Sequence, residues 1–194
     1  MAAPHRTIRG GAVKQPPGPG EFVLGGVDWT RWSVILVKPD CVRRDLTDAV
    51  LERINYEVPV LSRRWVTVED WQIFVHYWDM LVNKDWFPDR DIVTCLRNNY
   101  VGQEVVVALA HGPEGTDTPA LVRSLLGHFD PSRAVPGTIR ADLGVDSLRL
   151  ASSQGRLIDN LIHASDDAAA ACRDFGTWYG ANAWSLLDLG GKES

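Results

Sequence analysis

The sequence predicts an α+β domain, in which strands and helices alternate along most of the chain. Short apolar runs such as residues 34–37 and 105–109 are typical of buried strands, and longer stretches carry apolar residues at helical spacing. The predicted order is strand, helix, strand, one or two helices, strand, helix, long connection, strand, helix. Two β-α-β units around an antiparallel sheet would give a split, ferredoxin-like arrangement. Periodicity alone fits another α/β sandwich equally well.

The first half of the chain gives a strand, a helix and a second strand. The strand at 34–37 runs into Lys38 and Pro39, and the proline ends it, so Lys38 is expected just beyond the strand. A second strand is predicted for residues 58–68. Between the two strands, apolar residues recur at helical spacing: Leu46, Ala49, Val50 and Ile54.

A second helical pattern follows, and its aromatic residues are expected to pack in the core or at a subunit interface. It is interrupted at Trp86, and residues 91–97 form another short helix. The residues of the pattern are Trp71, Phe74, Val75, Trp78 and Val82.

The second half begins with a strand at 104–110 that is apolar on both faces, as in the centre of a sheet. A helix over 118–126 ends at Gly127. Residues 129–160 show little periodicity and form a long connection, and connections of this length are often functional.

Composition limits the possible functions. The chain has 194 residues, with 20 Lys and Arg against 25 Asp and Glu and a net charge of −5, which argues against a dedicated nucleic-acid binder. Its 3 cysteines include no C-x-x-C pair, so reduced thiols are expected and not a disulfide frame or a zinc site.

Three regions are predicted along the chain. Residues 1–27 form a flexible arm rich in Gly and Pro, residues 28–180 the folded domain, and residues 181–194 a tail. There is no apolar core of a secretory signal and no stretch of about 20 apolar residues. A soluble, cytoplasmic protein without membrane contact is expected.

The run from Asn160 to Asp167, Asn-Leu-Ile-His-Ala-Ser-Asp-Asp, places one histidine at a strand-to-helix junction. Ser165 is predicted to cap the helix that follows. Regular structure on both sides would fix the His163 imidazole, as a nucleophile requires. A structural histidine beside a capped helix is the alternative.

Three motifs together resemble the nucleoside diphosphate kinase family. They are Lys38-Pro39-Asp40 at a strand end, the Pro-Gly-Thr-Ile-Arg turn ending at Arg140, and the Asn-x-x-His-Ala-Ser-Asp run that contains His163. The resemblance covers about residues 32–179 and implies a ferredoxin-like βαββαβ antiparallel sheet covered by helices.

The resemblance also implies a site and a reaction. His163 would accept the terminal phosphate of a nucleoside triphosphate and pass it to a nucleoside diphosphate. Ser165 and Asp174 would orient His163, and Trp86 would stack on the base. Mg²⁺ would be held mainly by the substrate phosphates, without a protein metal site, and the protein would be a homo-oligomer. The residues matching the family's phosphate- and sugar-binding positions are Lys38, Tyr77, Arg123, Arg140 and Asn160.

The chain also departs from the family pattern. Phe129 stands where a phosphate-binding threonine is usual, Asp174 is shorter than the usual glutamate, and Asp45 replaces a common glycine. Residues 147–159 form an insertion of about ten residues that borders the predicted site.

Two other functions therefore remain open. One is a specialised kinase for a modified nucleotide or a metabolite phosphate, and the other is a nucleotide-binding interaction protein without catalysis. No Walker A loop or G-x-S-x-G string occurs. His76, His111 and His128 are expected to be surface or satisfied core residues.

Overall fold

The computed structural model describes residues 23–82 and 91–188, and a four-stranded antiparallel sheet lies at its centre. The strand order is β4-β5-β3-β6, with β3 (Trp32–Val37) and β5 (Glu104–His111) in the middle and β4 (Val60–Thr67) and β6 (Ile162–Ala164) at the edges. This order confirms the predicted ferredoxin-like fold.

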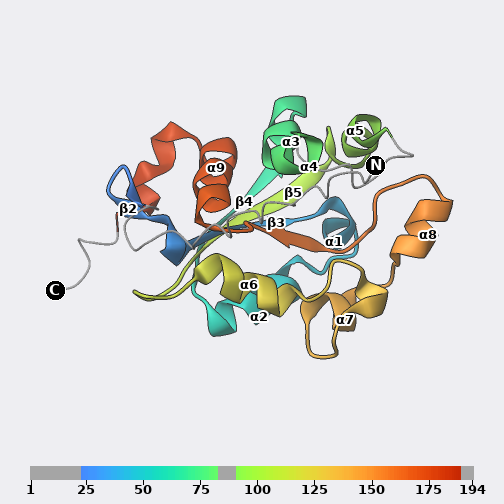
Figure 1. Cartoon of the computed structure of the whole chain (residues 1–194), viewed down its shortest axis with the longest axis horizontal. Coiled ribbons are helices and arrows are strands. Elements are labelled where there is room, and N and C mark those ends of the chain that lie inside the picture. The colour runs from blue at the N-terminus through green and yellow to red at the C-terminus, as the bar shows by residue number, and fades with distance from the viewer. Residues whose placement is uncertain (1–22, 83–90, 189–194) are drawn as a thin grey trace, which may run out of the picture.

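Helices cover both faces of the sheet (Figure 1). On one face lie α3 (Asp70–His76), α4 (Trp78–Val82), α5 (Ile92–Tyr100) and α9 (Ala168–Trp178). On the other lie α2 (Thr47–Glu57), α6 (Thr118–Leu126) and α7 (Ile139–Leu143). β3 alternates between the two resulting cores, with Val34 and Leu36 facing the first group and Ile35 and Val37 the second.

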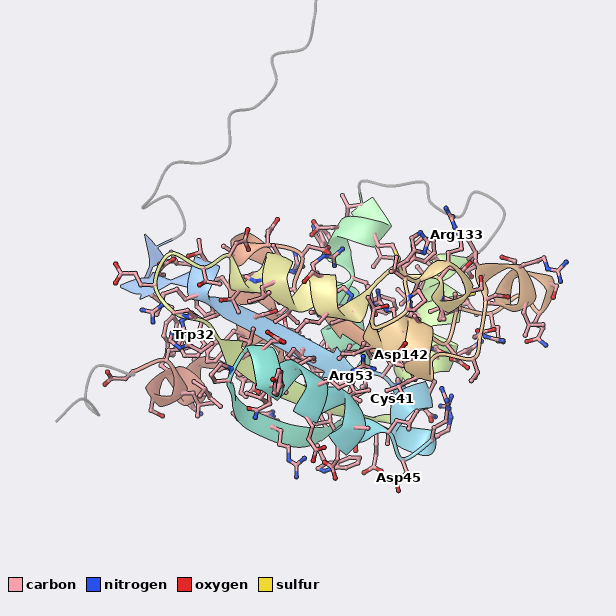
Figure 2. The ribbon with its side chains drawn as sticks, turned by 90° about the horizontal axis from the view of Figure 1, so that it is seen from below. Trp32, Cys41, Asp45, Arg53, Arg133 and Asp142 are labelled. Carbon is pink, nitrogen blue, oxygen red and sulfur yellow. The ribbon has the colours of Figure 1, made fainter. Side chains whose placement is uncertain are left out.

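Figure 2 shows the second face, where Arg53 of α2 forms an ion pair of 2.7 Å with Asp142 of α7. Asp45, between α1 (Pro39–Arg43) and α2, has a φ of 54° in the left-handed region. Aspartate tolerates this region better than most residues, which explains why it can replace a glycine there.

The remaining elements are short. A hairpin of β1 (Val23–Leu24) and β2 (Val27–Asp28) leads into η1 (Trp29–Arg31), and η3 (Ala181–Leu186) follows α9. Trp184 of η3 contacts Trp29 at 6.3 Å between ring centroids. None of the helices described in 23–82 and 91–188 has the length and apolar character needed to cross a bilayer.

Two local predictions are wrong. The helical pattern of residues 71–82 is broken at Tyr77 into α3 and α4. Trp71 and Trp78 are 52% and 54% exposed, so they lie outside the core of this chain, and their packing at a subunit interface stays a prediction. The connection 129–160 contains three short helical segments, which are η2 (Pro131–Arg133), α7 and α8 (Leu148–Ser153). Elements this short carry too few residues to give a periodic signal.

Candidate functional site

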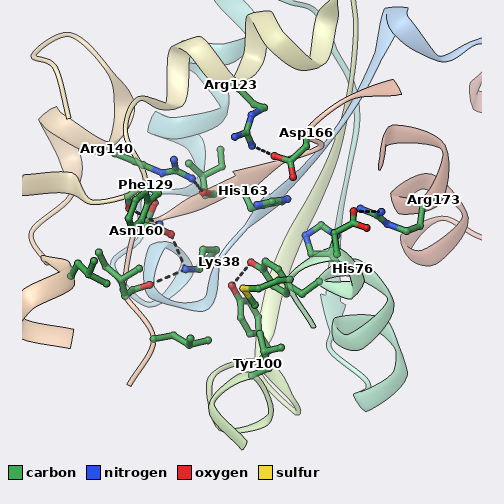
Figure 3. A pocket seen from close by; sticks show the side chains of 18 residues that line it. Lys38, His76, Tyr100, Arg123, Phe129, Arg140, Asn160, His163, Asp166 and Arg173 are labelled. Atoms are coloured by element: carbon green, nitrogen blue, oxygen red, sulfur yellow. Dashed lines mark hydrogen bonds and ion pairs between the residues drawn. The ribbon is translucent and has the colours of Figure 1, made fainter. Parts of the chain in front are cut away.

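A single cavity of about 420 Å³ collects most of the predicted site residues (Figure 3). Trp86 lies in 83–90, outside the described residues, and Ser165 and Asp174 do not line the cavity. The predicted residues that do line it are Lys38, Tyr77, Arg123, Arg140, Asn160 and His163. The fold thus brings the end of β3, the helices α6 and α7 and the start of β6 to one place.

The backbone just before His163 makes a tight turn at Leu161. Leu161 has a φ of 70°, and the N–H of Ile162 donates to the carbonyl of Asn160 at 2.8 Å, which closes a three-residue turn. The N–H of Leu161 donates to Asp40 Oδ2 at 2.9 Å, and the N–H of Lys38 donates to the Leu161 carbonyl at 2.8 Å. A branched side chain in this region is strained, and it persists only where the surroundings fix it.

Arg140 holds the same segment from the side. Its Nε and Nη2 donate to the carbonyls of Asn160 and Ile162 at 3.2 and 2.6 Å, and its Nη1 donates to Gly127 at 2.9 Å. Burial lowers the pKa of Arg140 to about 10, so the guanidinium stays charged at neutral pH. A guanidinium has five N–H groups, so two remain for a ligand after these three bonds.

Lys38 and Asn160 form a second bonded pair in the cavity. The Lys38 ammonium donates to Asn160 Oδ1 at 2.8 Å and to the Ile158 carbonyl at 3.0 Å. The Asn160 amide in turn donates to the Phe129 carbonyl at 2.7 Å. Burial, and then the charge of Arg140, lower the pKa of Lys38. One ammonium N–H and one amide N–H are left over.

Arg123 and Tyr77 complete the polar lining. Arg123, near the end of α6, forms an ion pair with Asp166 and is 45% exposed at the side chain. The hydroxyls of Tyr77 and Tyr100 are 2.8 Å apart. Burial raises the pKa of Tyr77 to about 12, so its phenol stays neutral and can donate a hydrogen bond.

His163 lies in the middle of β6, opposite Leu36 of β3, and is half-buried at the cavity. Its pKa lies well below the ordinary value, because burial, and then the neighbouring His76 ring and the charge of Arg140, disfavour the imidazolium. The ring is therefore neutral at physiological pH and keeps a nitrogen lone pair, which a nucleophile needs.

The helix after His163 is capped differently from the prediction. Asp167, not Ser165, is the N-cap of α9, because its side chain accepts from the Ala170 N–H at 2.8 Å. Ser165 is fully buried, and its hydroxyl donates to Asp174 Oδ2 at 2.9 Å. Asp167, two positions further along, was an equally good capping signal, since Asp and Ser are comparable N-caps.

The predicted orienting contact does not reach His163 directly. Asp174 Oδ1 lies 3.1 Å from Nδ1 of His76, and within the described residues neither Ser165 nor Asp174 hydrogen-bonds His163. His76 is 3% exposed, and its ring lies 4.7 Å from that of His163. The prediction placed His76 outside the site. Its position immediately before Tyr77, a predicted site residue, was the only signal in the sequence.

The insertion forms part of the cavity wall. It folds into α8 and a following loop, and contributes Leu148, Leu157 and Ile158 to the lining. Phe129 lies nearby, 45% exposed, with its ring stacked on His128 at 4.6 Å. This side of the cavity is apolar, in contrast to the cationic side around His163.

Carboxylates are few in this cavity and already paired. Asp166 pairs with Arg123, and Asp79 lies 2.7 Å from Arg173. Among residues 23–82 and 91–188 no group of three or more His, Cys, Asp or Glu side chains is arranged to hold a metal ion. The lining therefore suits an anion, with which a hard cation can arrive already bound.

Known proteins resemble the chain in sequence. The family model for nucleoside diphosphate kinase matches residues 32–183. The nucleoside diphosphate kinase of a Nocardioides species is 30% identical over 148 residues, which cover 76% of this chain and 95% of the relative. The nucleoside diphosphate kinase of Borreliella burgdorferi is 29% identical over 153 residues, which cover 77% of this chain and 87% of the relative.

Solved structures agree. A transition-state mimic of the nucleoside-diphosphate kinase from Borrelia burgdorferi, with bound vanadate and ADP, superposes with a TM-score of 0.70 at 27% identity, covering 78% of this chain and 88% of that one. An NDP kinase from Pyrobaculum aerophilum superposes with a TM-score of 0.64 at 26% identity, covering 78% of this chain and 97% of that one. The chain therefore belongs to the nucleoside diphosphate kinase family.

Proposed function

We propose that this chain moves the terminal phosphoryl group of a nucleoside triphosphate to a nucleoside diphosphate, with His163 as the covalent carrier. Relatives that match this chain over nearly their whole length are named nucleoside diphosphate kinases, and one related structure contains ADP with vanadate. A single carrier residue gives a ping-pong cycle, in which the first diphosphate leaves before the second binds.

The observation that carries the proposal is the set of unused donors around a neutral imidazole. After their bonds to the protein, Lys38, Asn160 and Arg140 keep one, one and two N–H groups. Phosphoryl transfer depends on such donors, because negative charge spreads over the oxygens of the transferred group.

Each half of the cycle is a substitution at phosphorus. A nitrogen lone pair of His163 forms a bond to the terminal phosphorus, and the bond from that phosphorus to the bridging oxygen breaks. The diphosphate leaves with the electron pair. A terminal oxygen of the second diphosphate then attacks the phosphohistidine, and the imidazole departs neutral. Lys38 and Arg140 would neutralise the oxygens, and Tyr77 and Asn160 would orient the nucleotide.

Mg²⁺ is the proposed cofactor, held by substrate phosphates and water. It would neutralise phosphate charge during transfer. Asp79 and Asp166 are the carboxylates that line the cavity, and each is already paired with an arginine, so the phosphates and water would supply the ligands.

The test is covalent labelling. The protein is incubated with Mg²⁺ and γ-labelled ATP, and we expect an acid-labile, base-stable phosphoprotein that passes its label to ordinary nucleoside diphosphates. His163→Ala should lose the label. His111→Ala, which changes a histidine in contact with Trp32 and away from the cavity, should keep it. Wild-type protein that takes no label, or a labelled His163→Ala, would refute the proposal. Labelling without transfer to ordinary diphosphates would point to a different acceptor.

A homo-oligomeric, cytoplasmic enzyme is also proposed. The edge strand β4 supports self-association, because its outer side carries exposed Leu61 and Trp65, and open strand edges pair readily. Free thiols at Cys41, Cys95 and Cys172 suit a reducing compartment. Light scattering of wild type and Trp65→Lys tests the first point: a monomeric wild type would refute it.

A further inference from the structure

His76, the last residue of α3, lies between a buried carboxylate and the predicted nucleophile. Its Nδ1 is 3.1 Å from Asp174 Oδ1, and its ring lies 4.7 Å from that of His163, at 80° to it. Figure 3 shows the two rings side by side. Tyr77 lies against both rings, at 4.8 Å from His76 and 5.5 Å from His163.

The protonation of His76 follows from its neighbours. The Trp178 indole nitrogen also lies 3.1 Å from Nδ1, and an indole N–H can only donate. Nδ1 therefore either accepts from Trp178 or donates to Asp174, but cannot do both in one tautomer. Asp174 is fully buried, and Arg173 Nε, at 3.5 Å from Oδ1, is too distant for a full hydrogen bond. Without the His76 donor this buried carboxylate oxygen would be under-bonded, which costs more than a lost indole bond. This assigns the hydrogen to Nδ1.

The other nitrogen of His76 is then a bare acceptor. Nε2 is buried and has no hydrogen-bond partner among the described residues. Buried nitrogens are rarely left without a partner, so such a group calls for an explanation. The neighbouring ring of His163, which must be held at a defined angle during transfer, offers one.

We propose that His76 is a positioning residue for His163, and that Asp174 acts on the nucleophile only through it. The inference rests on the proposed function for its kinetic consequences, but not for its geometry. Ser165 holds Asp174, Asp174 holds the ring of His76, and that ring limits the rotation of the His163 side chain. The side chain of Asp174 does not hydrogen-bond His163 itself, and the imidazole of His76 lies between them.

The kinetic test uses a pair of variants. His76→Leu combined with Asp174→Leu removes the ring and the carboxylate together. Arg173, which also lies near Asp174, keeps its ion pair with Asp79, so no buried charge is left unpaired. We expect kcat for phosphoryl transfer to fall on the order of 100-fold, as for a misplaced reacting group. KM should change less than about threefold, because Lys38, Asn160 and Arg140 keep their donors.

Two further variants control this result. Asp174→Asn keeps an oxygen that accepts from His76, so kcat should stay within about threefold of wild type, the scale of one neutral hydrogen bond. His111→Leu, in a histidine away from the cavity, should have no effect. Wild-type kcat in the double variant, or a loss confined to KM, would overturn the proposal.

Nuclear magnetic resonance gives a readout that needs no nucleotide. Long-range ¹H–¹⁵N spectra of the imidazoles, assigned with His163→Ala, should show hydrogen on Nδ1 and not on Nε2 of neutral His76. The double variant should shift the His163 resonances. Unchanged His163 resonances would overturn positioning even if transfer were slow. If wild-type protein takes no phosphate, the proposed function fails, and these spectra still decide the role of His76.

Discussion

Two sides of the cavity differ in how firmly the fold holds them. The floor is defined as Lys38, Arg140, Asn160 and His163. The first three of these side chains are hydrogen-bonded, and the backbone at Leu161, just before His163, is strained and held by hydrogen bonds. The rim, defined as Phe129, Leu148, Leu157 and Ile158, is apolar and partly exposed. The rim side chains make no hydrogen bonds, so packing against neighbouring side chains is what fixes their positions, as for Phe129 on His128.

This difference suggests separate roles: the floor would serve the chemical step, and the rim would serve the choice of nucleotide. Floor residues depend on one another, so changing one should affect both stability and transfer. Rim side chains line the cavity without hydrogen-bonding the floor, so changing them should alter nucleotide binding and leave the chemical step nearly intact. The predictions below test this division.

The largest effect is expected for Arg140→Lys. An ammonium cannot reach the three carbonyls that Arg140 bonds, so the turn at Leu161 loses its lateral support. We expect a loss of at least about 3 kcal/mol in the free energy of unfolding, since at least two of the three bonds are lost and bonds to charged groups contribute about 1.5–3 kcal/mol each. Transfer should fall at least on the order of 100-fold. Urea unfolding and steady-state kinetics measure both.

Arg133→Lys is the matched control, because Arg133 is exposed on η2 and does not line the cavity. It should change neither quantity. An Arg140→Lys protein with wild-type stability would show that the floor residues do not depend on the hydrogen bonds of Arg140.

A second prediction concerns pH. The folded pKa of His163 lies well below the ordinary histidine value of 6.5, so the neutral imidazole should persist as the pH falls through 6.5. The acid limb of kcat/KM should therefore appear below pH 6.5. The free energy of unfolding should also fall with pH. Below about pH 6.5 the unfolded chain binds a proton at His163 more readily than the folded chain does, so the stabilisation from neutral His163 is complete above about pH 6.5 and declines as pH falls toward the folded pKa. An acid limb above pH 6.5 would contradict the assignment.

A smaller effect is expected at the rim for Phe129→Thr. The change places a hydroxyl donor at the cavity and removes a ring that is 45% exposed. One added neutral hydrogen bond is typically about 0.5–1.5 kcal/mol, so KM should fall roughly 2- to 10-fold while kcat changes little. Val135→Thr, at a residue 70% exposed, is the control. A large change in kcat would place Phe129 with the floor.

The smallest catalytic effect is expected for Arg156→Gln. Arg156 lies 2.6 Å from Asp146 and anchors the loop after α8. Asp146 keeps its backbone bond to the Asp159 N–H at 2.9 Å, so the loss in unfolding free energy should be about 1–2 kcal/mol. kcat should remain within about twofold. Arg149→Gln, exposed on α8, should be neutral. A strong loss of kcat would show that the insertion takes part in the chemical step.

Much of the fold could be predicted because its long elements carry strong patterns. The apolar runs gave β3 and β5, and the stripe from Leu46 to Ile54 matches α2. The helices within 129–160 escaped prediction, because five or six residues hold less than two turns and no repeated face.

The candidate site was predictable to a different degree. Motif order pointed to His163, Lys38 and Arg140, and all three line one cavity. His76 could not be assigned from the chain, because its role depends on α3 meeting α9 across 98 residues. The capping residue of α9 was missed because Ser165 and Asp167 are similar candidates, and only the backbone path decides between them.

The sequence by itself determined which residue types stand at the strand ends, and through them it indicated the family and the residue proposed as the nucleophile. Tertiary structure alone decided which donors are already used by backbone carbonyls, which side of the cavity is apolar, and that an imidazole separates Asp174 from His163. The physical reason is that local pattern encodes burial and helix or strand preference. Hydrogen-bond partners are chosen only when distant segments pack, and a shift of about 1 Å is enough to change the choice.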